Sequence, residues 1–285
     1  GDIYADVIII AEGANSVLAE REGLKDIPSQ KRMALAVKEV LSLPEEVIQD
    51  RFGLNDSEGV AIEYFGDAVN GMFGSAFIYT NKQSISIGVG CSLDDIGKKK
   101  INSHDLLEYF KSHKCVQDYL RGGTSVEYCA HMIPEAGYKG IPNVAGNGVL
   151  LVGDCAGLVN TSFFHEGTNL SMASGMMAAE TVIEARKEKD FSMRTLSRYK
   201  EKLESSFVIA DMDKFKEFPF LGDKRPELLN DYPEIVAEMI TEYFAVDGKS
   251  KKEIEKNVVK KFRKKIGIPK IIKDSYAISK SMGWI

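Results

Sequence analysis

The stretch of sequence with the clearest chemical potential is Gly148–Gly157, in which a short apolar run ends in a Gly-Asp pair. The run predicts a buried strand that delivers Gly153 and Asp154 at its carboxyl end, the edge where ligands bind in open α/β sheets. Glycine lets a backbone approach a ligand closely, and a carboxylate accepts hydrogen bonds from sugar-like hydroxyls. Gly153, Asp154 and Gly157 therefore form a candidate binding turn, although an ordinary turn explains the pair equally well.

A second chemical feature is Glu166-Gly167-Thr168-Asn169, which opens a predicted helix over residues 168–187. The free N–H groups and positive dipole end of a helix stabilise negative charge on a ligand. A reduced flavin ring develops such a charge at its N1/O2 edge. An ordinary helix start at Gly167 is the alternative. Small residues on this helix would allow close approach of a backbone or a flat ligand, namely Ser171, Ala173, Ser174, Gly175, Ala178 and Ala179.

The opening segment predicts a further strand and turn. Within Ile3–Ala11, the run Val7–Ile10 places apolar residues on both faces, which is typical of a parallel strand covered on both sides. Glu12–Ser16 predicts a sharp turn, and Val17–Glu22 predicts one or two helical turns. The opening segment and the Gly148–Gly157 region therefore predict two pieces of an α/β domain.

The middle of the chain has the sequence pattern of an antiparallel sheet. Residues 84–89 alternate with period two, which predicts one buried face and one small or polar face. Turn-forming residues separate this strand from its neighbours. Further strands are predicted at 33–43, 60–65 and 71–80, and helices at 104–114 and 116–120. The sheet is thus inserted between the two α/β pieces.

The last third of the chain is predicted to be helical and charged. Helices are expected at 194–210, 232–244 and 250–265. The last has an apolar stripe at helical spacing. Lys249–Lys265 contains nine Lys or Arg and two Glu, a local charge of +7 in a chain of net charge −5. Either this is a solvated helix face, or it docks on anionic lipid headgroups or an acidic partner.

Length and composition fit a globular protein of about two domains, at about 150 residues per domain. The 285 residues are 44% hydrophobic and 28% charged, which excludes global disorder. The acidic balance disfavours general nucleic-acid binding. A spanning helix needs about 18–20 consecutive apolar residues, and no run here approaches that length. No basic and apolar secretion signal opens the sequence.

The four cysteines are Cys91, Cys115, Cys129 and Cys155, and none forms a C-x-x-C pair. We therefore expect neither zinc nor iron–sulfur ligation within this chain, and no other metal site is predicted. Reduced thiols are the expectation for a cytoplasmic protein. The basic segment leaves open a peripheral location on the inner face of the cell membrane.

Several motifs together resemble one family of flavoproteins. Asp6–Ser16 resembles the second flavin motif of FAD-dependent reductases and hydroxylases, and Gly153–Gly157 resembles their third. The order of strand motif, inserted sheet, Gly-Asp motif and small-residue helix is also theirs. More narrowly, three segments are similar to FixC proteins, relatives of electron-transfer-flavoprotein:quinone oxidoreductase: Val37–Val40, Phe77–Lys82 and His131–Tyr138.

This resemblance implies a function. FixC-like proteins hold one FAD and pass electrons from a FixA/FixB flavoprotein pair toward a quinone, accompanied by a ferredoxin-like FixX subunit. In some organisms the complex performs electron bifurcation. The flavin itself carries the electrons, so no acid–base catalytic residue is implied. The cysteine spacing favours the FixC branch over single-chain quinone reductases with an iron–sulfur domain.

The resemblance also implies roles for particular residues. Asp154, in the Gly153–Gly157 turn, would bind the ribityl chain, and Gly167, Thr168 and Asn169 would face the pyrimidine side of the isoalloxazine. Ala11 and Gly13 would pass close to the adenine half of FAD. For the quinone, Phe163, Phe164 and His165 precede the helix, and Tyr64 and Tyr79 fall on the inserted sheet; packing is the alternative role for each. Neither His131 nor Glu135 has a partner identifiable from sequence.

The expected fold class is α/β with an α+β insertion. A Rossmann-like FAD-binding domain of the glutathione-reductase/hydroxylase type would comprise residues 1–30 and 131–190, with the antiparallel-sheet quinone domain at 31–130 and a helical region at 191–285. The family's first flavin motif, G-x-G-x-x-G after a strand, cradles the pyrophosphate and does not occur in this sequence. We therefore expect the chain to be the C-terminal part of a longer protein.

Three other functions compete with a FixC-like electron carrier. A geranylgeranyl-reductase-like enzyme has the same flavin motifs but reduces isoprenoid double bonds. A flavin hydroxylase is less favoured, because nothing in the sequence indicates a small polar aromatic substrate. The chain would alternatively be a non-catalytic module that docks a redox partner.

Overall fold

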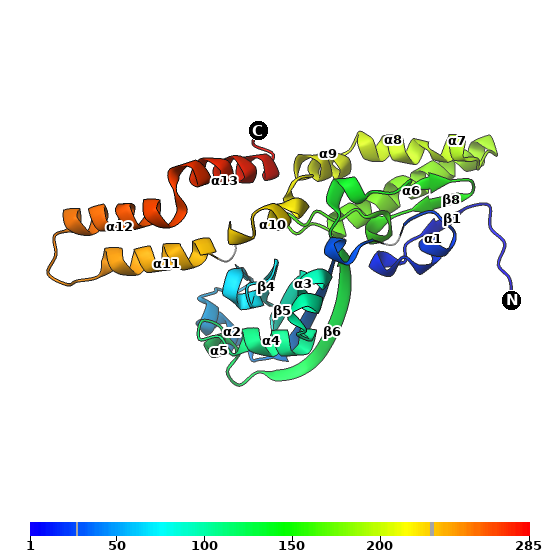
Figure 1. Cartoon of the computed structure of the whole chain (residues 1–285). Coiled ribbons are helices and arrows are strands. Elements are labelled where there is room, and N and C mark those ends of the chain that lie inside the picture. The colour runs from blue at the N-terminus through cyan, green and yellow to red at the C-terminus, as the bar shows by residue number, and fades with distance from the viewer. Residues whose placement is uncertain (27, 229–230) are drawn as a thin grey trace. The chain divides into compact units, whose positions relative to one another are not determined.

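The computed structural model describes residues 1–26, 28–228 and 231–285, and the chain divides into two compact units (Figure 1). Segments far apart in sequence make up each unit, so long-range packing rather than chain continuity defines them. Unit 1 comprises Gly1–Ala36, Ser92–Lys99 and Ala130–Pro219, and unit 2 comprises Val37–Cys91, Lys100–Cys129 and Phe220–Ile285.

A three-stranded sheet of order β1-β8-β7 organises unit 1. Strand β1 (Ile8–Ile10) is parallel to β8 (Val149–Leu151), with Ile9 opposite Leu150, and β7 (Ala145–Gly146) is antiparallel to β8. The prediction that the apolar run Val7–Ile10 forms a parallel strand is therefore confirmed, and the structure identifies β8 as its partner. It places the turns that follow β1 and β8 at the same edge of the sheet.

The burial of β1 differs from the sequence-based expectation of a strand covered on both sides. Ile10 is buried, but Ile8 and Ile9 are 52% and 40% exposed. The described part of unit 1 thus covers only the carboxyl end of β1. Short 3₁₀ turns follow both parallel strands, η1 (Gly13–Asn15) after β1 and η5 (Gly153–Ala156) after β8. Helix α1 (Val17–Arg21) begins directly after η1, as predicted.

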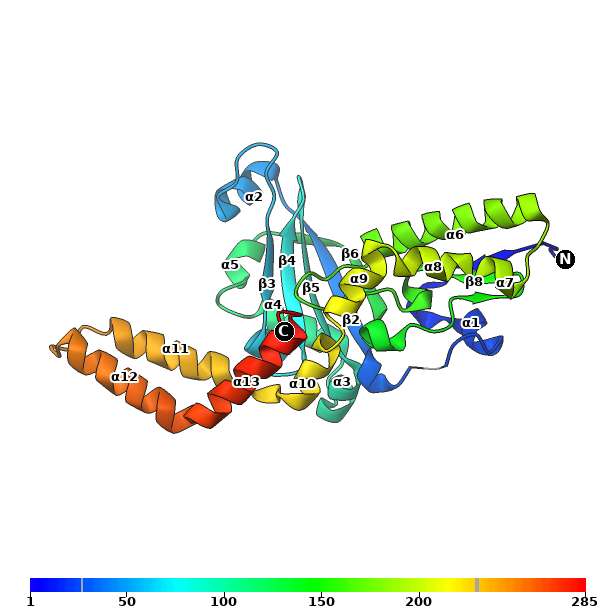
Figure 2. The same ribbon diagram turned by 90° about the horizontal axis from the view of Figure 1, so that it is seen from above.

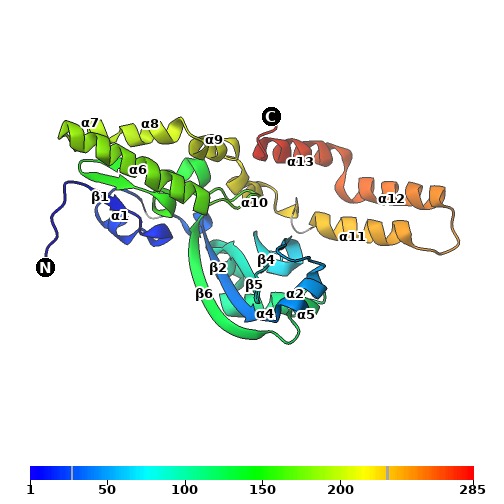
Figure 3. The same cartoon turned by 180° about the vertical axis from the view of Figure 1, so that it is seen from behind.

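Helix α6 (Thr168–Glu188) packs on this sheet with three shorter helices, α7 (Met193–Leu196), α8 (Arg198–Glu204) and α9 (Phe207–Lys214) (Figure 3). A single helix over 194–210 was predicted, and the structure breaks it. Ser206 lies at one break, where its hydroxyl caps α9 by accepting a hydrogen bond from the Val208 N–H at 3.2 Å. Serine competes for backbone groups in this way and favours helix starts over helix interiors.

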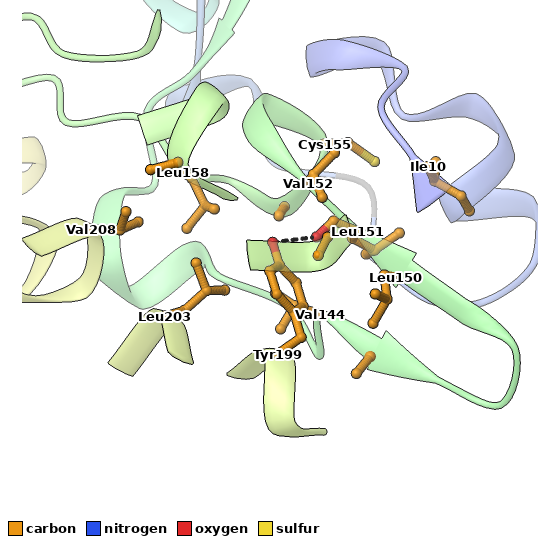
Figure 4. Packing of buried hydrophobic residues seen from close by; sticks show 14 of the residues in the cluster. Ile10, Val144, Leu150, Leu151, Val152, Cys155, Leu158, Tyr199, Leu203 and Val208 are labelled. Carbon is orange, nitrogen blue, oxygen red and sulfur yellow. Dashed lines mark hydrogen bonds between the residues drawn. The ribbon is translucent and has the colours of Figure 1, made fainter. Parts of the chain in front are cut away.

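The core of unit 1 lies between the sheet and these helices (Figure 4). Its largest fully buried side chain is Tyr199 of α8, whose hydroxyl donates to the Leu151 carbonyl of β8 at 3.0 Å. Burial raises the pKa of Tyr199 well above its usual range. The phenol therefore fixes α8 to the strand that leads into the Gly-Asp turn.

A five-stranded sheet of order β3-β4-β5-β2-β6 organises unit 2 (Figure 2). One end of each of three of its strands, β2, β5 and β6, belongs to unit 1. The sequence predicted four of the strands, and β6 is the addition. The strands are β2 (Met33–Ser42), β3 (Ala61–Tyr64), β4 (Gly74–Thr80), β5 (Ser84–Ser92) and β6 (Thr124–Pro134).

The register of β3, β4 and β5 sorts their side chains onto two faces. Both pairings are antiparallel, with Tyr64 opposite Ala76 and Tyr79 opposite Ala61. Because side chains alternate along a strand, Tyr64 and Tyr79 point to opposite faces of the sheet. The alternation predicted for residues 84–89 is present: Ile85, Ile87 and Val89 are buried on the same face as Ala76 and Ile78.

Helices cover parts of unit 2. Asn102 caps α4 by accepting from the Asp105 N–H at 2.7 Å, and α4 buries Leu106, Leu107 and Phe110. The sequence predicted α4 and α5 but not α2. The short helical segments of unit 2 are α2 (Glu45–Phe52), η3 (Gly66–Val69), α4 (Ser103–Lys111) and α5 (Gln117–Leu120). Those of unit 1 are η2 (Gln30–Arg32), α3 (Leu93–Lys99) and η4 (Gly137–Gly140). The segment η6 (Phe218–Phe220) begins in unit 1, and its last residue belongs to unit 2.

The C-terminal part of unit 2 is helical, as predicted. Lys261 and Lys265 pair with Glu242 and Glu238, respectively, which fixes α11 and α12 as an antiparallel hairpin. Asp274 of α13 is only 2% exposed and pairs with Lys270 at 2.8 Å. The helices are α10 (Leu221–Lys224), η7 (Pro226–Leu228), α11 (Asp231–Phe244), α12 (Lys251–Ile266) and α13 (Ile268–Ser281). In the described residues, no helix has the length and apolar character needed to cross a membrane.

Candidate functional site

The candidate binding turn after β8 requires glycine at its first position. Gly153 has a φ of +61°, a left-handed conformation that favours glycine. A Cβ at this position would lie 3.1 Å from the Ser171 hydroxyl of α6. The Gly153 N–H donates to the Ser174 hydroxyl at 3.0 Å. The small residues of α6 thus let the helix and the turn approach one another closely.

Asp154 presents a partly exposed carboxylate at this turn. One oxygen accepts a hydrogen bond from the Ser171 hydroxyl at 3.4 Å, and the other lies 3.9 Å from Nε2 of His131. His131, which had no partner identifiable from sequence, is therefore brought beside Asp154. The carboxylate keeps 24% of its side-chain surface exposed and retains acceptor capacity for a ligand hydroxyl.

The amino end of α6 is open. Gly167 is the N-cap residue, and within the described part of the chain no side chain caps the helix there. A Cβ on Gly167 would meet no atom within 4 Å, and Thr168 and Asn169 are exposed. Unsatisfied N–H groups at the positive end of a 21-residue helix are suited to a ligand with negative character.

A polar network lies beneath the turns after β1 and β8. Lys25 donates to the Ser16 hydroxyl at 2.8 Å and to the Cys155 carbonyl at 3.1 Å. Ser16 is fully buried and has a left-handed φ of +47°. Lys25 therefore joins the turn of the Asp6–Ser16 motif to the turn of the Gly-Asp motif.

Burial shifts the ionisation of this network. Desolvation lowers the pKa of Lys25, against the opposing effect of nearby acidic groups. Desolvation also raises the pKa of the Cys155 thiol, which lies 4.0 Å from the Glu12 carboxylate. Cys155 is therefore a packed thiol rather than a reactive one.

Glu12 has a local structural role that sequence reasoning did not identify. Its two carboxylate oxygens accept hydrogen bonds from the N–H groups of Leu18 and Ala19 at 2.8 and 2.7 Å. A carboxylate at the amino end of α1 also complements the helix dipole. The spacing of Glu12 ahead of Val17–Glu22 was an available signal for this cap. For Lys25, which lies in a loop after α1, no comparable signal exists.

Unit 1 contains all the residues that the sequence predicted for the flavin side: Ala11, Gly13, Gly153, Asp154, Gly157, Gly167, Thr168 and Asn169. The aromatic residues Phe163 and Phe164 also lie in unit 1 and are 49% and 63% exposed. Their rings contact Phe218 and Phe215 at centroid distances of 5.0 and 5.3 Å. His165 adjoins them with a left-handed φ of +46°.

The other two aromatic residues expected at a quinone site do not share a surface. Tyr64 packs edge-on against Phe110 of α4 at 5.1 Å, and burial raises its pKa to about 12. Tyr79 stacks on Phe77 at 5.6 Å on the opposite face of the sheet. A flat ligand lying on one face of β3 and β4 would therefore meet only one of the two tyrosines.

Glu135 is a partly buried carboxyl directly after β6. Its N–H donates to the Arg32 carbonyl at 2.8 Å. Burial raises the pKa of Glu135 to about 7; the Arg32 guanidinium opposes the shift and the Asp95 carboxylate adds to it. The three residues belong to unit 1.

The expectation of no metal site can be compared with the residues that the structure describes, in which no group of three or more His, Cys, Asp or Glu has a metal-binding arrangement. In the part of the chain that the structure describes, the four cysteines form no disulfide bond, and Cys91 and Cys155 are buried.

Two solved structures show what fold this chain resembles. A geranylgeranyl bacteriochlorophyll reductase-like protein from Thermoplasma acidophilum matches with a TM-score of 0.64 at 17% identity, covering 95% of this chain and 61% of its own. The flavin-dependent brominase Bmp2 matches with a TM-score of 0.54 at 14% identity, covering 92% and 64%. The chain thus has the mixed α/β fold of FAD-binding flavoenzymes with a helical C-terminal region, as predicted.

Sequence comparisons identify the family. Residues 218–283 match the ETF-QO/FixC family C-terminal domain. Protein FixC of Azorhizobium caulinodans is 42% identical over 264 residues, which are 92% of this chain and 60% of the relative. Protein FixC of Bradyrhizobium diazoefficiens is 41% identical over 99% of this chain and 65% of the relative. The probable electron transfer flavoprotein-quinone oxidoreductase YdiS of Escherichia coli is 40% identical over 95% and 63%.

The chain therefore belongs to the FixC family, which confirms the resemblance inferred from its motifs. It spans between 60% and 65% of the length of these curated relatives.

We predict that Lys25→Met lowers the free energy of unfolding of the full-length protein by about 1–2 kcal/mol. The substitution removes the ammonium group that donates to both Ser16 and the Cys155 carbonyl, and it leaves the buried Ser16 hydroxyl with one partner fewer. Urea unfolding measures the effect, with the exposed Lys187→Met of α6 as the matched control. Equal losses in the two variants would contradict a bridging role for Lys25.

We predict that Glu135→Gln changes the pH dependence of stability. The folded protein keeps the Glu135 proton up to a pKa of about 7, whereas the unfolded chain releases it near 4.5. Native stability is therefore lost as pH rises from 4.5 to 7. Relative to wild type, the glutamine variant should gain about 1–3 kcal/mol over this window, at about 1.4 kcal/mol per pKa unit.

Urea unfolding at several pH values measures this gain. Glu127→Gln, which changes an exposed carboxylate on β6, is the control. If the Glu135 and Glu127 variants differ from wild type by the same amount at every pH, Glu135 does not hold a proton in the folded state.

Proposed function

We propose that the full-length protein is a FAD-dependent oxidoreductase that passes electrons from an electron-transfer flavoprotein to a quinone. The observation that carries this proposal is the meeting of the Gly-Asp turn and the open amino end of α6 in a FixC-family chain. The printed name of the Escherichia coli relative, a probable electron transfer flavoprotein-quinone oxidoreductase, supports the same reaction class.

The residues at this site fit the flavin and ribityl parts of FAD. Asp154 has a partly exposed carboxylate suited to a ribityl hydroxyl, and the amides from Gly167 to Asn169 suit the pyrimidine edge. Ala11 and Gly13 would lie toward the adenine half. When bound, FAD supplies the redox chemistry, and the protein tunes its potential by hydrogen bonds and dipoles.

For the acceptor, we propose that Phe163, Phe164 and His165 border a quinone ring. Their support is the exposure of both phenylalanine rings on the residues just before α6. On the sheet, Tyr79 and its neighbour Phe77 offer a stacked aromatic surface. Tyr64, proposed from sequence for the same role, is engaged with Phe110 on the other face.

The partners proposed are a FixA/FixB-like electron-transfer flavoprotein and a FixX-like ferredoxin subunit, with electron bifurcation as the fuller form of the activity. The family membership supports this set. We further propose peripheral contact of the full-length protein with an anionic membrane surface through α12. Its support is the +7 charge of Lys249–Lys265 beside exposed apolar residues such as Val259 and Ile268.

A geranylgeranyl-reductase-like activity is the second candidate. The fold match to the Thermoplasma acidophilum reductase-like protein, at a TM-score of 0.64, favours it. The family match distinguishes the two, because the relatives at about 40% identity are named FixC or quinone oxidoreductase. A non-catalytic docking module is the third.

The full-length protein should contain FAD and reduce quinone with electrons from a reduced electron-transfer flavoprotein. The assay follows quinone reduction in vesicles of neutral and of anionic lipid, and anionic lipid should give the faster rate. Reduction of prenyl double bonds without quinone turnover would replace this function with the second candidate. Partner binding by a preparation that never contains flavin would leave only the docking module.

We predict that Thr168→Ala retains FAD but changes its midpoint potential. The Thr168 hydroxyl and the adjacent amides would stabilise the negative charge of the reduced ring. Loss of one hydrogen bond of about 1 kcal/mol corresponds to a one-electron shift of roughly 40 mV, toward lower potential. A spectroelectrochemical titration measures the shift, and Thr241→Ala on α11 is the control. An unchanged potential would remove Thr168 from this role.

A further inference from the structure

The five residues Thr161–His165, here called the aromatic loop, are closed at their base by the two flanking residues. These residues, Asn160 and Glu166, are here called the neck. At the neck, Asn160 and Glu166 exchange two backbone hydrogen bonds, of 2.8 and 3.0 Å. The loop therefore leaves and rejoins the body of unit 1 at a fixed point, immediately before α6 begins at Thr168.

The side chains at the neck make a second closure. The Glu166 carboxylate accepts from the Asn160 amide at 2.8 Å through one oxygen and from the Asn169 amide at 2.9 Å through the other. One carboxylate thus joins the residue before the loop to the first turn of α6. Asn160 is only 3% exposed, so water has little access to replace Glu166 as its partner.

The same asparagine also orders the inside of the aromatic loop. Its side-chain oxygen accepts from the Ser162 N–H at 3.1 Å, and the Ser162 hydroxyl accepts from the Phe164 N–H at 3.4 Å. The His165 N–H donates to the Ser162 carbonyl at 3.0 Å, which holds His165 in a left-handed conformation that non-glycine residues seldom adopt. The loop conformation therefore depends on the position of Asn160.

We propose that Glu166 is a positioning residue that clamps Asn160 to Asn169 and thereby fixes the aromatic loop at the amino end of α6. The clamp holds Phe163 and Phe164 where their rings rest on Phe218 and Phe215 and still remain about half exposed. This inference rests on the proposed function in one respect: the fixed aromatic edge is what a quinone ring would meet.

The hydrogen-bond pattern of the clamp predicts different effects for single and double substitutions at Asn160 and Glu166. In Asn160→Asp, a second carboxylate replaces the amide that Glu166 accepts from, so two negative charges meet in a buried neck. In the double variant Asn160→Asp with Glu166→Gln, every hydrogen bond can form again. The aspartate accepts from Ser162 and from the new glutamine amide, and the glutamine oxygen accepts from Asn169.

The single variant Glu166→Gln should have only a small effect. Its glutamine oxygen can still accept from Asn160, and the exposed Asn169 can rotate its own amide to accept from the glutamine. The expected order of disruption is therefore large for Asn160→Asp, small for Glu166→Gln and small for the double variant. Glu180→Gln, which changes a carboxylate on the outer part of α6, is the matched control.

Hydrogen exchange of the full-length protein tests the clamp directly. The Ser162, Phe164 and His165 amides should exchange at least about tenfold faster in Asn160→Asp, and the double variant should restore the wild-type rates. Exchange in Asn160→Asp at the wild-type rate, or a double variant as fast as Asn160→Asp, would overturn the proposal. If Asn160→Asp does not fold, recovery of a folded protein with wild-type exchange in the double variant supports the clamp, and its failure to recover overturns it.

Steady-state kinetics test the consequence for the quinone. Asn160→Asp should raise the quinone KM by about fivefold or more, while reduction of the flavin by the electron-transfer flavoprotein stays within about twofold. If the wild-type protein reduces no quinone, the proposed function fails, but the exchange experiment still decides whether the clamp exists. If the exchange result holds and the quinone KM does not change, the loop is fixed but does not border the quinone.

Discussion

The parallel pairing of β1 with β8 is the constraint on which the candidate site depends. It brings the turn of the Asp6–Ser16 motif and the Gly-Asp turn to one edge of the sheet, although Ile10 and Leu151 are 141 positions apart in the sequence. Lys25 then joins the two turns through Ser16 and the Cys155 carbonyl. Tyr199 anchors the same strand from the other side through Leu151. The site is thus built from rigid elements, with few long side chains of its own.

The rigid elements also determine the electrostatics of the site. The groups suited to a ligand are the backbone amides at the start of α6 and one carboxylate, that of Asp154. This carboxylate lies beside the His131 ring and accepts a hydrogen bond from the Ser171 hydroxyl. Such groups are fixed before any ligand binds, so they stabilise charge without reorganisation. Glu12 stands outside this set, because both of its oxygens serve the N–H groups of Leu18 and Ala19.

The sequence predicted the elements whose patterns are local. The apolar run before Ile10, the alternation over residues 84–89 and the small-residue helix from Thr168 each carry their own signal, and the structure confirms all three. The contacts that depend on distant residues could not be predicted. His131 beside Asp154 and Lys25 beside Cys155 join residues more than 20 positions apart, and the opposite faces of Tyr64 and Tyr79 follow only from the strand register.

That register separates two tasks within a single sheet. Tyr64 and Ile78 belong to the face that packs on buried side chains such as Phe110, whereas Phe77 and Tyr79 occupy the other face above Gly88. A Cβ on Gly88 would lie 2.3 Å from the Phe77 ring, so the absence of a side chain there lets the ring lie flat. A different side chain at Tyr79 would therefore stay outside the face that Phe110 packs on, whereas any side chain at Gly88 would have to displace the Phe77 ring.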